Sequence, residues 1–312
     1  MILSCGDALI DFVPVAAADG GEAVRPMVGG SCLNVAIGLA RLDVPTGFVG
    51  GIANDVFGRM IAQHAETSNV ALDFATRSDR QTTLAFVRII AGESQYAFYD
   101  AQTASREWTY QPGSIPFGGI DAVHVGSTTL VNETGAAETA ALIADAKPTS
   151  TISFDPNCRP NLVKDKAAYL DQMQGFADSA DIVRMSDVDF VYLHGDEAYA
   201  ARAEALFARG ITLFVVTRGT DGAEAWHRKA GFIKADAPSI DVVDTIGAGD
   251  SFQAALLAAL HRQDRIARAR LGEMTADELR CALSFACRCA ALTCTRILAV
   301  SRGTTGNEKA IT

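Results

Sequence analysis

The stretch DTIGAGDSF, residues 244–252, places an aspartate, Asp250, directly after Gly-Ala-Gly at the start of a helical pattern. The two glycines permit a tight turn and a close backbone approach. We therefore expect the backbone N–H groups of Gly247, Ala248 and Gly249 to lie at a helix N-terminus. Such a terminus has unpaired donors and carries about half a positive charge, which suits a phosphate group. The same field is expected to keep Asp250 ionised.

An ionised carboxylate beside an anion site is the arrangement that phosphoryl transfer needs. The amides would stabilise the charge on the transferred group, and Asp250 would accept the proton of the attacking hydroxyl. The alternative is that Asp250 only caps its helix. GAGDSF lacks the third glycine of G-x-G-x-x-G, and no G-K-[ST] follows it. A dinucleotide fingerprint and a Walker A loop are therefore both poorly supported.

A second glycine turn precedes another helical pattern near the N-terminus. Gly29 and Gly30 lead into a helix that starts near Ser31, with Asn34 in its first turns. Two glycines let a ligand approach the backbone, and an amide side chain serves sugar hydroxyls as donor and acceptor. The alternative is a glycine turn with a local cap.

Two acids stand between the first two predicted strands. In GDALID, Asp7 follows the first strand and Asp11 begins the next extended piece. Ligands of open α/β sheets bind at the carboxyl ends of the strands, where carboxylates could accept from two sugar hydroxyls. An acid after a strand is, however, more often a turn residue.

Two further strands end in loops with polar residues or glycines. ISFDPNCRP brings Asp155, Asn157 and Arg159 together in a loop that two prolines make rigid. These side chains suit magnesium-bound water and phosphate oxygens. The second loop, a weaker candidate for approach to a phosphate or nucleotide, contains Thr217, Gly219 and Gly222.

Short β-rich runs alternate with longer helical runs along the chain. This alternation predicts βαβ units and a parallel sheet that is covered on both faces. The expected strands are Ile2–Cys5, Gly47–Gly51, Ala122–Gly126, Thr151–Asp155, Asp181–Arg184 and Thr212–Thr217. The expected helices are Leu33–Leu42, Val56–Glu66, Thr134–Ala146, Lys166–Phe176, Asp196–Arg209 and Ala276–Thr293, the last with a capping box from Thr275 to Glu278. Val242 and Val243 are expected to end a further extended piece.

One region breaks the alternation. Residues 82–99 contain two β-type runs around the turn AGES, which predicts a hairpin, and Phe12–Val15 adds another extended piece. We infer a small antiparallel sheet attached to the α/β body. Such a sheet could serve as a lid that excludes water from a cleft. The alternative is an insertion packed against the core.

The composition restricts the classes of function. The chain has 312 residues, of which 49% are hydrophobic and 21% charged, as in a soluble globular protein. Its net charge of −10 argues against a nucleic acid partner. No signal peptide and no apolar run of about 20 residues is visible, so we expect a cytoplasmic protein with no membrane partner. The seven cysteines contain no C-x-x-C pair, and we interpret the C-terminal group of them as packed hydrophobes.

Together these motifs resemble the ribokinase-like (phosphofructokinase-B type) carbohydrate kinase family along essentially the whole chain. GGSCLNVAIGLARLDVPTGFVGGIANDVFG is similar to the N-terminal signature of the family, and DTIGAGDSFQAALL is similar to the C-terminal one. GDALIDF, DPNCRP and the hairpin ending in FYD are most similar to bacterial fructokinases. The resemblance implies a single α/β domain over residues 1–312, with a three-layer α/β/α body and a mostly parallel central sheet. It also implies a β-sheet lid from about residues 12–28 and 80–110, through which two chains often form a homodimer.

The resemblance further implies an ATP-dependent sugar kinase in which Asp250 is the base and Gly247, Ala248 and Gly249 form the anion hole. The implied substrate-binding residues are Asp7, Asp11, Gly29, Gly30, Asn34, Phe98, Asp100 and Arg159. The implied nucleotide-binding residues are Asn157, Ser186, Thr217, Gly219, Gly222 and Thr245. Mg²⁺ would accompany ATP, with Asp189 acting on it through water, and K⁺ is a further candidate ion.

Three departures from the family pattern affect these expectations. Ser186 and Asp189 would replace the Asn and Glu of an N-x-x-E motif, and Cys287 stands where relatives often carry an asparagine near the adenine. Asp100 follows the lid tyrosine where 2-keto-3-deoxygluconate kinases often carry arginine, and an acid there would repel a carboxylate. A neutral sugar is therefore favoured, with fructose first and 2-keto-3-deoxygluconate or another sugar or nucleoside as the alternative. From other classes, a non-catalytic sugar- or nucleotide-binding module stays open, and an oxidoreductase is opposed by the missing G-x-G-x-x-G.

Overall fold

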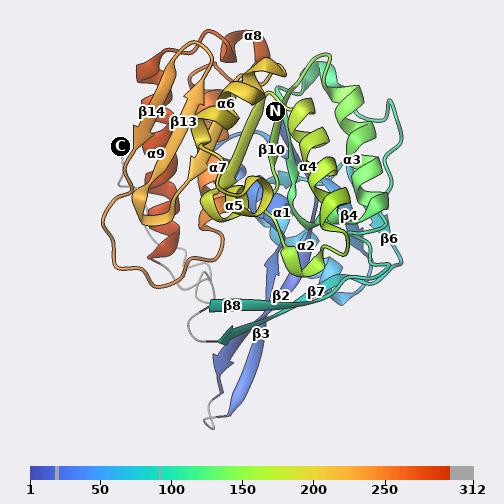
Figure 1. Ribbon diagram of the computed structural model, residues 1–312. Coiled ribbons are helices and arrows are strands. Elements are labelled where there is room, and N and C mark those ends of the chain that lie inside the picture. The colour runs from blue at the N-terminus through green and yellow to red at the C-terminus, as the bar shows by residue number, and fades with distance from the viewer. Residues whose placement is uncertain (18–20, 91–92, 296–312) are drawn as a thin grey trace.

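The computed structural model describes residues 1–17, 21–90 and 93–295 (Figure 1). Its main sheet has the strand order β14-β13-β12-β11-β10-β9-β1-β4-β5, and β6 also pairs with β4. Strand pairs from β4 to β12 are parallel, whereas β12, β13 and β14 are antiparallel. The strands are β1 Ile2–Cys5, β4 Thr46–Ala53, β5 Val70–Ala71, β6 Ala75–Ser78, β9 Ala122–Gly126, β10 Thr151–Asp155, β11 Ile182–Ser186, β12 Leu213–Thr217, β13 Ala223–His227 and β14 Gly231–Ala235.

Helices cover both faces of this sheet, as the sequence predicts (Figure 1). One buried hydrophobic cluster contains residues of α3, α4, α5 and α6, and another contains residues of α1, α7 and α9. Alternate residues of β9 belong to opposite clusters, because successive side chains of a strand point to opposite faces. The helices are α1 Ser31–Arg41, α2 Val56–Thr67, α3 Glu133–Ala146, α4 Lys166–Ser179, α5 Asp187–His194, α6 Tyr199–Ala208, α7 Ala248–Arg262, α8 Arg268–Leu271 and α9 Ala276–Cys294. None of the described helices is long and apolar enough to cross a lipid bilayer.

A separate four-stranded sheet, which we call the lid sheet, projects from one edge of the body (Figure 1). Its order is β3-β2-β7-β8, with β2 Leu9–Ala16, β3 Glu22–Gly29, β7 Thr83–Ile90 and β8 Glu93–Tyr99. The predicted hairpin is confirmed as β7 and β8. The sheet is not wholly antiparallel, however, because β2 and β7 pair in parallel. Each follows a strand of the main sheet, β1 or β6, that ends at the same edge, so both leave the body in one direction.

The register of the lid sheet gives it two different faces. Asp11 pairs with Ala85, which pairs with Phe98, so these side chains share one face. The opposite face carries Phe12 and Phe86, whose rings stack with centroids 4.7 Å apart. The lid sheet ends at Tyr99, and the chain then returns to the body.

Several boundaries differ from the sequence predictions. Val242 and Val243 form no strand; both are more than half exposed, and the Val243 N–H donates to the Cys294 carbonyl at 2.8 Å. The helix expected over Asp196–Arg209 begins only at Tyr199. The capping box of α9 is confirmed, with the Glu278 N–H donating to the Thr275 side chain at 3.3 Å. Helix α5 and the strands β3, β6, β13 and β14 were not predicted.

Candidate active site

The N-terminus of α7 lies at the centre of the candidate site. Gly247 has the left-handed conformation (φ +75°), and the helix begins at Ala248, as predicted. Gly249 and Asp250 are therefore the second and third helical residues, whose amides have no intrahelical acceptor. The Ala248 N–H was expected to be free for an anion, but it donates to the Thr245 carbonyl at 3.2 Å.

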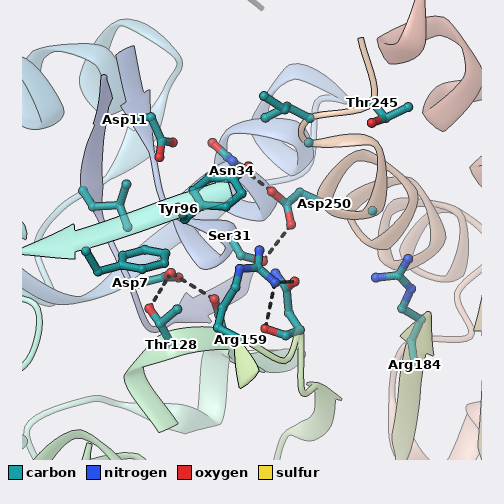
Figure 2. Close-up of a pocket in the computed structure, with 18 residues that line it drawn as sticks. Asp7, Asp11, Ser31, Asn34, Tyr96, Thr128, Arg159, Arg184, Thr245 and Asp250 are labelled. Carbon is teal, nitrogen blue, oxygen red and sulfur yellow. Dashed lines mark hydrogen bonds between the residues drawn. The ribbon is translucent and has the colours of Figure 1, made fainter. Parts of the chain in front are cut away.

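Asp250 is held by two donors from the first turn of α1 (Figure 2). The Ser31 hydroxyl donates to Oδ1 at 2.7 Å, and the Asn34 amide donates to Oδ2 at 2.8 Å. Burial raises the pKa of Asp250 above its usual value, and the hydrogen bonds from Ser31 and Asn34 act in the opposite direction. The field of the helix N-terminus was expected to keep Asp250 ionised, whereas burial favours its protonated form. A carboxylate with a raised pKa suits a proton acceptor that works near neutral pH.

A polar cavity of about 270 Å³ opens between Asp250 and the lid sheet. We call it the polar cavity. Of the predicted residues, it is lined by Asp7, Asp11, Gly30, Asn34, Phe98, Asn157, Arg159, Thr245, Gly247, Gly249 and Asp250. The residues that line it without having been predicted include Ser31, Tyr96, Ser127, Thr128 and Arg184. Tyr96 lies two positions before Phe98 on β8, so strand periodicity is the signal that could have found it.

Asp11 projects from the lid sheet toward this cavity (Figure 2). Burial, followed by the charge of Asp7, raises its pKa to about 7; Arg159 lowers it and Asp250 raises it further. Gly29 leaves room for this side chain, because a Cβ there would lie 2.1 Å from Asp11 Oδ2. Gly29 thus acts on Asp11 and does not line the cavity.

Asp7 is engaged by the protein itself. Its Oδ1 accepts the Cys32 N–H at 3.1 Å, and its Oδ2 accepts the hydroxyls of Ser127 (2.9 Å) and Thr128 (3.0 Å). These bonds connect the end of β1 to α1 and to the 3₁₀ helix Ser127–Val131, which follows β9. Both oxygens of Asp7 thus already have partners, so this carboxylate has less capacity than Asp11 to accept hydrogen bonds from a ligand.

The loop after β10 directs Arg159 into the polar cavity (Figure 2). Arg159 Nη1 donates to Asn157 Oδ1 at 2.7 Å, and its guanidinium carbon lies 6.0 Å from the centroid of the Tyr96 ring. Asn157 therefore orients Arg159. Asn157 lines the polar cavity. It was expected to bind a nucleotide, but it does not line the second cavity, which is described next and contains the glycines of the loop after β12.

A second cavity of about 220 Å³ lies between the loop after β12, α7 and α9. We call it the apolar cavity. Thr217, Gly219, Gly222 and Thr245 line it, as expected for a nucleotide site, together with Cys287. Gly222 has φ +84°, and a Cβ there would lie 2.0 Å from the Ala235 carbonyl oxygen, so no other residue fits this turn. The described residues that also line it are Arg184, Thr220, Ala237, Pro238, Ile240, Val242, Ala248, Gly249, Phe252, Ala290, Ala291 and Cys294.

The polar and apolar cavities meet at Arg184, Thr245 and Gly249, which line both. Arg184 lies on β11 and is 5% exposed. Its Nη1 donates to Asp155 Oδ2 at 2.5 Å, and its Nη2 donates to Thr217 Oγ1 at 2.6 Å. The sequence analysis did not single it out, although a charge inside the apolar run DIVRM is an available signal.

Asp100 lies outside both cavities. Its carboxylate pairs with Arg106 (Nη2–Oδ2, 2.5 Å), because the chain turns back after Tyr99 and Thr103 donates to the Asp100 carbonyl. It lines instead a third cavity of about 710 Å³. The expectation that Asp100 lies in the substrate cavity is therefore corrected. Repulsion by Asp100 no longer argues against a substrate that carries a carboxylate.

Ser186 and Asp189 also lie outside the two cavities that meet at Arg184. The Ser186 side chain caps α5 by accepting the Asp189 N–H at 3.0 Å. Asp189 is 8% exposed and accepts the Cys158 N–H at 3.0 Å. Among the described residues no group of three or more His, Cys, Asp or Glu side chains could hold a metal ion. These residues do not form a protein cage for Mg²⁺.

Comparison with known proteins gives consistent matches along the chain. The family described as "pfkB family carbohydrate kinase" matches residues 1–304. A fructokinase of Rhizobium leguminosarum bv. trifolii is 36% identical over 286 residues, which cover 90% of this chain and 86% of the relative. A fructokinase of Klebsiella pneumoniae is 31% identical, with 82% of each protein covered.

Solved structures match the same architecture. The fructokinase of Xylella fastidiosa with bound ATP superposes with a TM-score of 0.87 at 26% identity, covering 95% of this chain and 92% of that one. The fructokinase of Vibrio cholerae O395, in a form that binds fructose, ADP and calcium ion, has a TM-score of 0.80 at 26% identity and covers 95% and 92%. These matches confirm the predicted fold, a mostly parallel α/β body with a small separate sheet.

Proposed function

Because the chain belongs to the pfkB family of carbohydrate kinases, we propose that it phosphorylates fructose to fructose 6-phosphate with ATP. One observation carries the proposal from the structure. Asp250 lines the polar cavity and directly follows Gly249, one of the residues at which the polar and the apolar cavity meet. A kinase needs this arrangement, because the sugar hydroxyl must lie against a proton acceptor while the terminal phosphate of the nucleotide reaches the hydroxyl oxygen from another side.

The residues of the polar cavity would hold the sugar. Asp11 and Asn34 supply oxygen and amide groups for its hydroxyls, and Tyr96 and Phe98 would cover it from the lid sheet. Arg159 adds a cation to the same cavity. Gly29 and Gly30 would act indirectly, by leaving room for Asp11 and by shaping the turn into α1.

The chemical step then follows from the position of Asp250. The attacking hydroxyl oxygen forms a bond to the γ-phosphorus of ATP, and the bond from this phosphorus to the bridging oxygen of ADP breaks. Asp250 accepts the hydroxyl proton. The amides of Gly247 and Gly249 at the start of α7 would stabilise the charge on the transferred group. Thr217, Gly219, Gly222 and Thr245 would lie along the nucleotide.

Fructose is favoured by the names of several similar proteins. Fructokinases from Rhizobium leguminosarum and Klebsiella pneumoniae are more than 30% identical to this chain, and the Vibrio cholerae fructokinase structure contains fructose. With Asp100 turned away, 2-keto-3-deoxygluconate stays an alternative substrate. Its carboxylate would meet Arg159, but it would also meet Asp11 and Asp250 in the same cavity.

An ATP-consumption screen over fructose, ribose, tagatose, 2-keto-3-deoxygluconate and nucleosides tests this function. We expect the highest kcat/KM for fructose, with ³¹P and ¹³C spectra showing phosphate on its 6-hydroxyl. A higher value for another substrate would replace fructose in the proposal. Binding of sugar and ATP without turnover would instead support the non-catalytic alternative.

Three accompanying expectations belong to the same proposal. Mg²⁺ should be required, because it usually reaches kinase sites on the phosphates of the nucleotide. Addition of K⁺ to a K⁺-free assay tests whether a monovalent cation raises the rate. Pairing of two chains through the lid sheet is tested by light scattering, which distinguishes a mass of one chain from a mass of two.

A further inference from the structure

We propose that Arg184 binds the phosphate chain of the nucleotide and thereby connects the apolar cavity to Asp250. The proposal rests on the kinase function proposed above. It starts from the position of Arg184 in the middle of β11, where its side chain lines both cavities. In the view of Figure 2, Arg184 lies on the side of Asp250 that is opposite to Asp11.

Charge is the first argument. Among the described residues that line the two cavities, the cations are Arg159 and Arg184, and only Arg184 belongs to the apolar cavity. The polar cavity also contains three acids, namely Asp7, Asp11 and Asp250. A triphosphate that crosses from the apolar cavity toward these acids needs a positive group at the junction. Arg184 is placed to provide it.

The hydrogen bonds of Arg184 are the second argument. A guanidinium has five N–H donors. One Nη1 donor is directed to Asp155 and one Nη2 donor to Thr217, whereas the buried Nε of Arg184 has no partner in the described structure. Asp155 at the end of β10 and Thr217 at the end of β12 thus hold the guanidinium between the two strands that flank β11. One N–H of each Nη group is left for an anion. Planar guanidinium groups bind phosphate oxygens in this way.

The neighbouring helix N-terminus is the third argument. A Cβ at Gly249 would lie 3.3 Å from both Nη1 and Nη2 of Arg184, so the guanidinium packs directly against the first turn of α7. The centroid of the Phe252 ring lies 5.5 Å from the central carbon of the Arg184 guanidinium. A buried ion pair contributes little stability compared with apolar side chains of the same volume. A charge at this buried position is therefore better explained by a ligand than by folding.

Nucleotide affinity in the absence of sugar tests the proposal, because a structural role and a phosphate-binding role predict different results. Calorimetry measures the dissociation constants of adenosine and of MgATP. The dissociation constant of adenosine divided by that of MgATP, which we call the adenosine-to-ATP ratio, reports the contribution of the phosphates. Removal of Arg184 alone would leave the buried Asp155 unpaired. The informative pair is therefore Asp155→Asn, which keeps the guanidinium, and the double variant Asp155→Asn with Arg184→Gln.

We expect Asp155→Asn to keep the adenosine-to-ATP ratio of the parent protein. The double variant should lower that ratio about 10- to 100-fold, with adenosine affinity unchanged, because charged hydrogen bonds to phosphate are lost. Equal ratios in the two variants would overturn the role of Arg184. Failure of the parent protein to bind ATP would instead overturn the proposed kinase function.

Two further variants keep the test decisive. Arg184→Lys preserves a charge opposite Asp155, but one ammonium group cannot serve Asp155, Thr217 and a phosphate in the same geometry. Its ratio should fall between those of the parent and the double variant, and an unchanged ratio would contradict the proposal. Arg209→Gln is the control for loss of one positive charge, since Arg209 is exposed and pairs with Asp178 away from both cavities.

Discussion

At the scale of single residues, Asp250 shows how neighbouring donors direct a carboxylate. Ser31 and Asn34 each donate to one of its oxygens, and both come from the first turn of α1. An asparagine at position 250 would keep the volume of the side chain but could not accept a proton from a hydroxyl. Its effect on turnover therefore separates catalysis from packing.

We predict that Asp250→Asn lowers kcat about 10²- to 10⁴-fold, because the proposed general base is lost. Sugar affinity, measured by calorimetry, should change little. Asp171→Asn is the matched control, since Asp171 is an exposed acid on α4. Near-native turnover of Asp250→Asn would remove Asp250 from the role of base.

Asp11 predicts a pH dependence of stability. Its pKa is raised to about 7, first by burial and then by Asp7. The folded chain therefore binds a proton that the unfolded chain has lost between about pH 4 and pH 7, and Asp11 makes stability fall as the pH rises through this window. Asp11→Asn should flatten the fall and raise the free energy of unfolding at pH 8, by at most about 4 kcal/mol.

Urea unfolding at pH 5 and pH 8 measures this effect. The difference between the two pH values should shrink in Asp11→Asn and persist in Asp171→Asn. Equal differences in the parent protein and in Asp11→Asn would show that Asp11 titrates at its ordinary pKa. Asp250 and Asp189 have raised pKa values as well, so part of the pH dependence should remain.

Sequence reasoning succeeded best where a residue and its neighbours lie in one short motif. Gly247 and Asp250 were placed correctly, because the turn and the helix that position them are local. Asp100 was misplaced, since its direction depends on Arg106 and on how the chain leaves the lid sheet. Arg184 was missed, because its partners Asp155 and Thr217 come from two neighbouring strands of the sheet.

At the scale of elements, the turn at Gly30 joins the lid sheet to the body. It connects β3 to α1 with φ +105°, a conformation that other residues rarely adopt. A Cβ at Gly30 would lie 2.5 Å from the Asp7 carbonyl oxygen and 2.9 Å from the Ala8 Cα atom. These neighbours are backbone atoms in the connection from β1 to β2, which cannot move aside as a flexible side chain could.

We predict that Gly30→Ala lowers the free energy of unfolding by about 2 kcal/mol or more, through backbone strain and this overlap. Sugar affinity should fall with it, because Ser31 and Asn34 follow the turn. Gly118→Ala is the control, since a Cβ at Gly118 meets nothing within 4 Å. Urea unfolding of both variants checks the prediction, which a Gly30→Ala protein as stable as Gly118→Ala would contradict.

Element boundaries were predicted better inside the α/β alternation than outside it. The bounds of β1, β9 and β10 agree with the expected strands, since each is a short run of buried residues. The parallel pairing of β2 with β7 was not foreseen. A hairpin motif specifies the partner of β7 within the hairpin, whereas the partner on its other edge is set by the route of the chain through the body.

At the scale of the whole molecule, the two cavities belong to one body and share three lining residues. Each ligand that binds the folded chain and not the unfolded one should therefore raise the unfolding temperature. At 100 times its dissociation constant a ligand contributes about 2.7 kcal/mol. For a chain of this size the expected rise is roughly 5 °C.

We predict such a rise for MgATP and for fructose separately, measured by calorimetric melting of Asp250→Asn so that no turnover occurs. A sugar that is not phosphorylated should produce no rise at the same concentration. A rise with ATP and none with any sugar would contradict a sugar site in the polar cavity while leaving the nucleotide site in place.

The overall architecture was predictable because alternation of strands and helices leaves few arrangements of the chain. The order of strands in the main sheet could not be predicted in the same way. From β9 to β14 the strands lie side by side in chain order, whereas β1 lies between β4 and β9. Apolar patterns alone give no indication of this order, since the parallel strands β1, β4, β9, β10, β11 and β12 are similarly buried.

The position of β1 has a consequence for synthesis on the ribosome. Residues 2–5 are made before the other strands of the main sheet, yet one edge of this strand pairs with β9, which ends at Gly126. At 5–20 residues per second, that partner emerges roughly 6 to 24 s later. During this interval an apolar strand with an unpaired edge is open to contact with other nascent chains. Recombinant yield should therefore respond to slower translation and to chaperones that shield the first hundred residues.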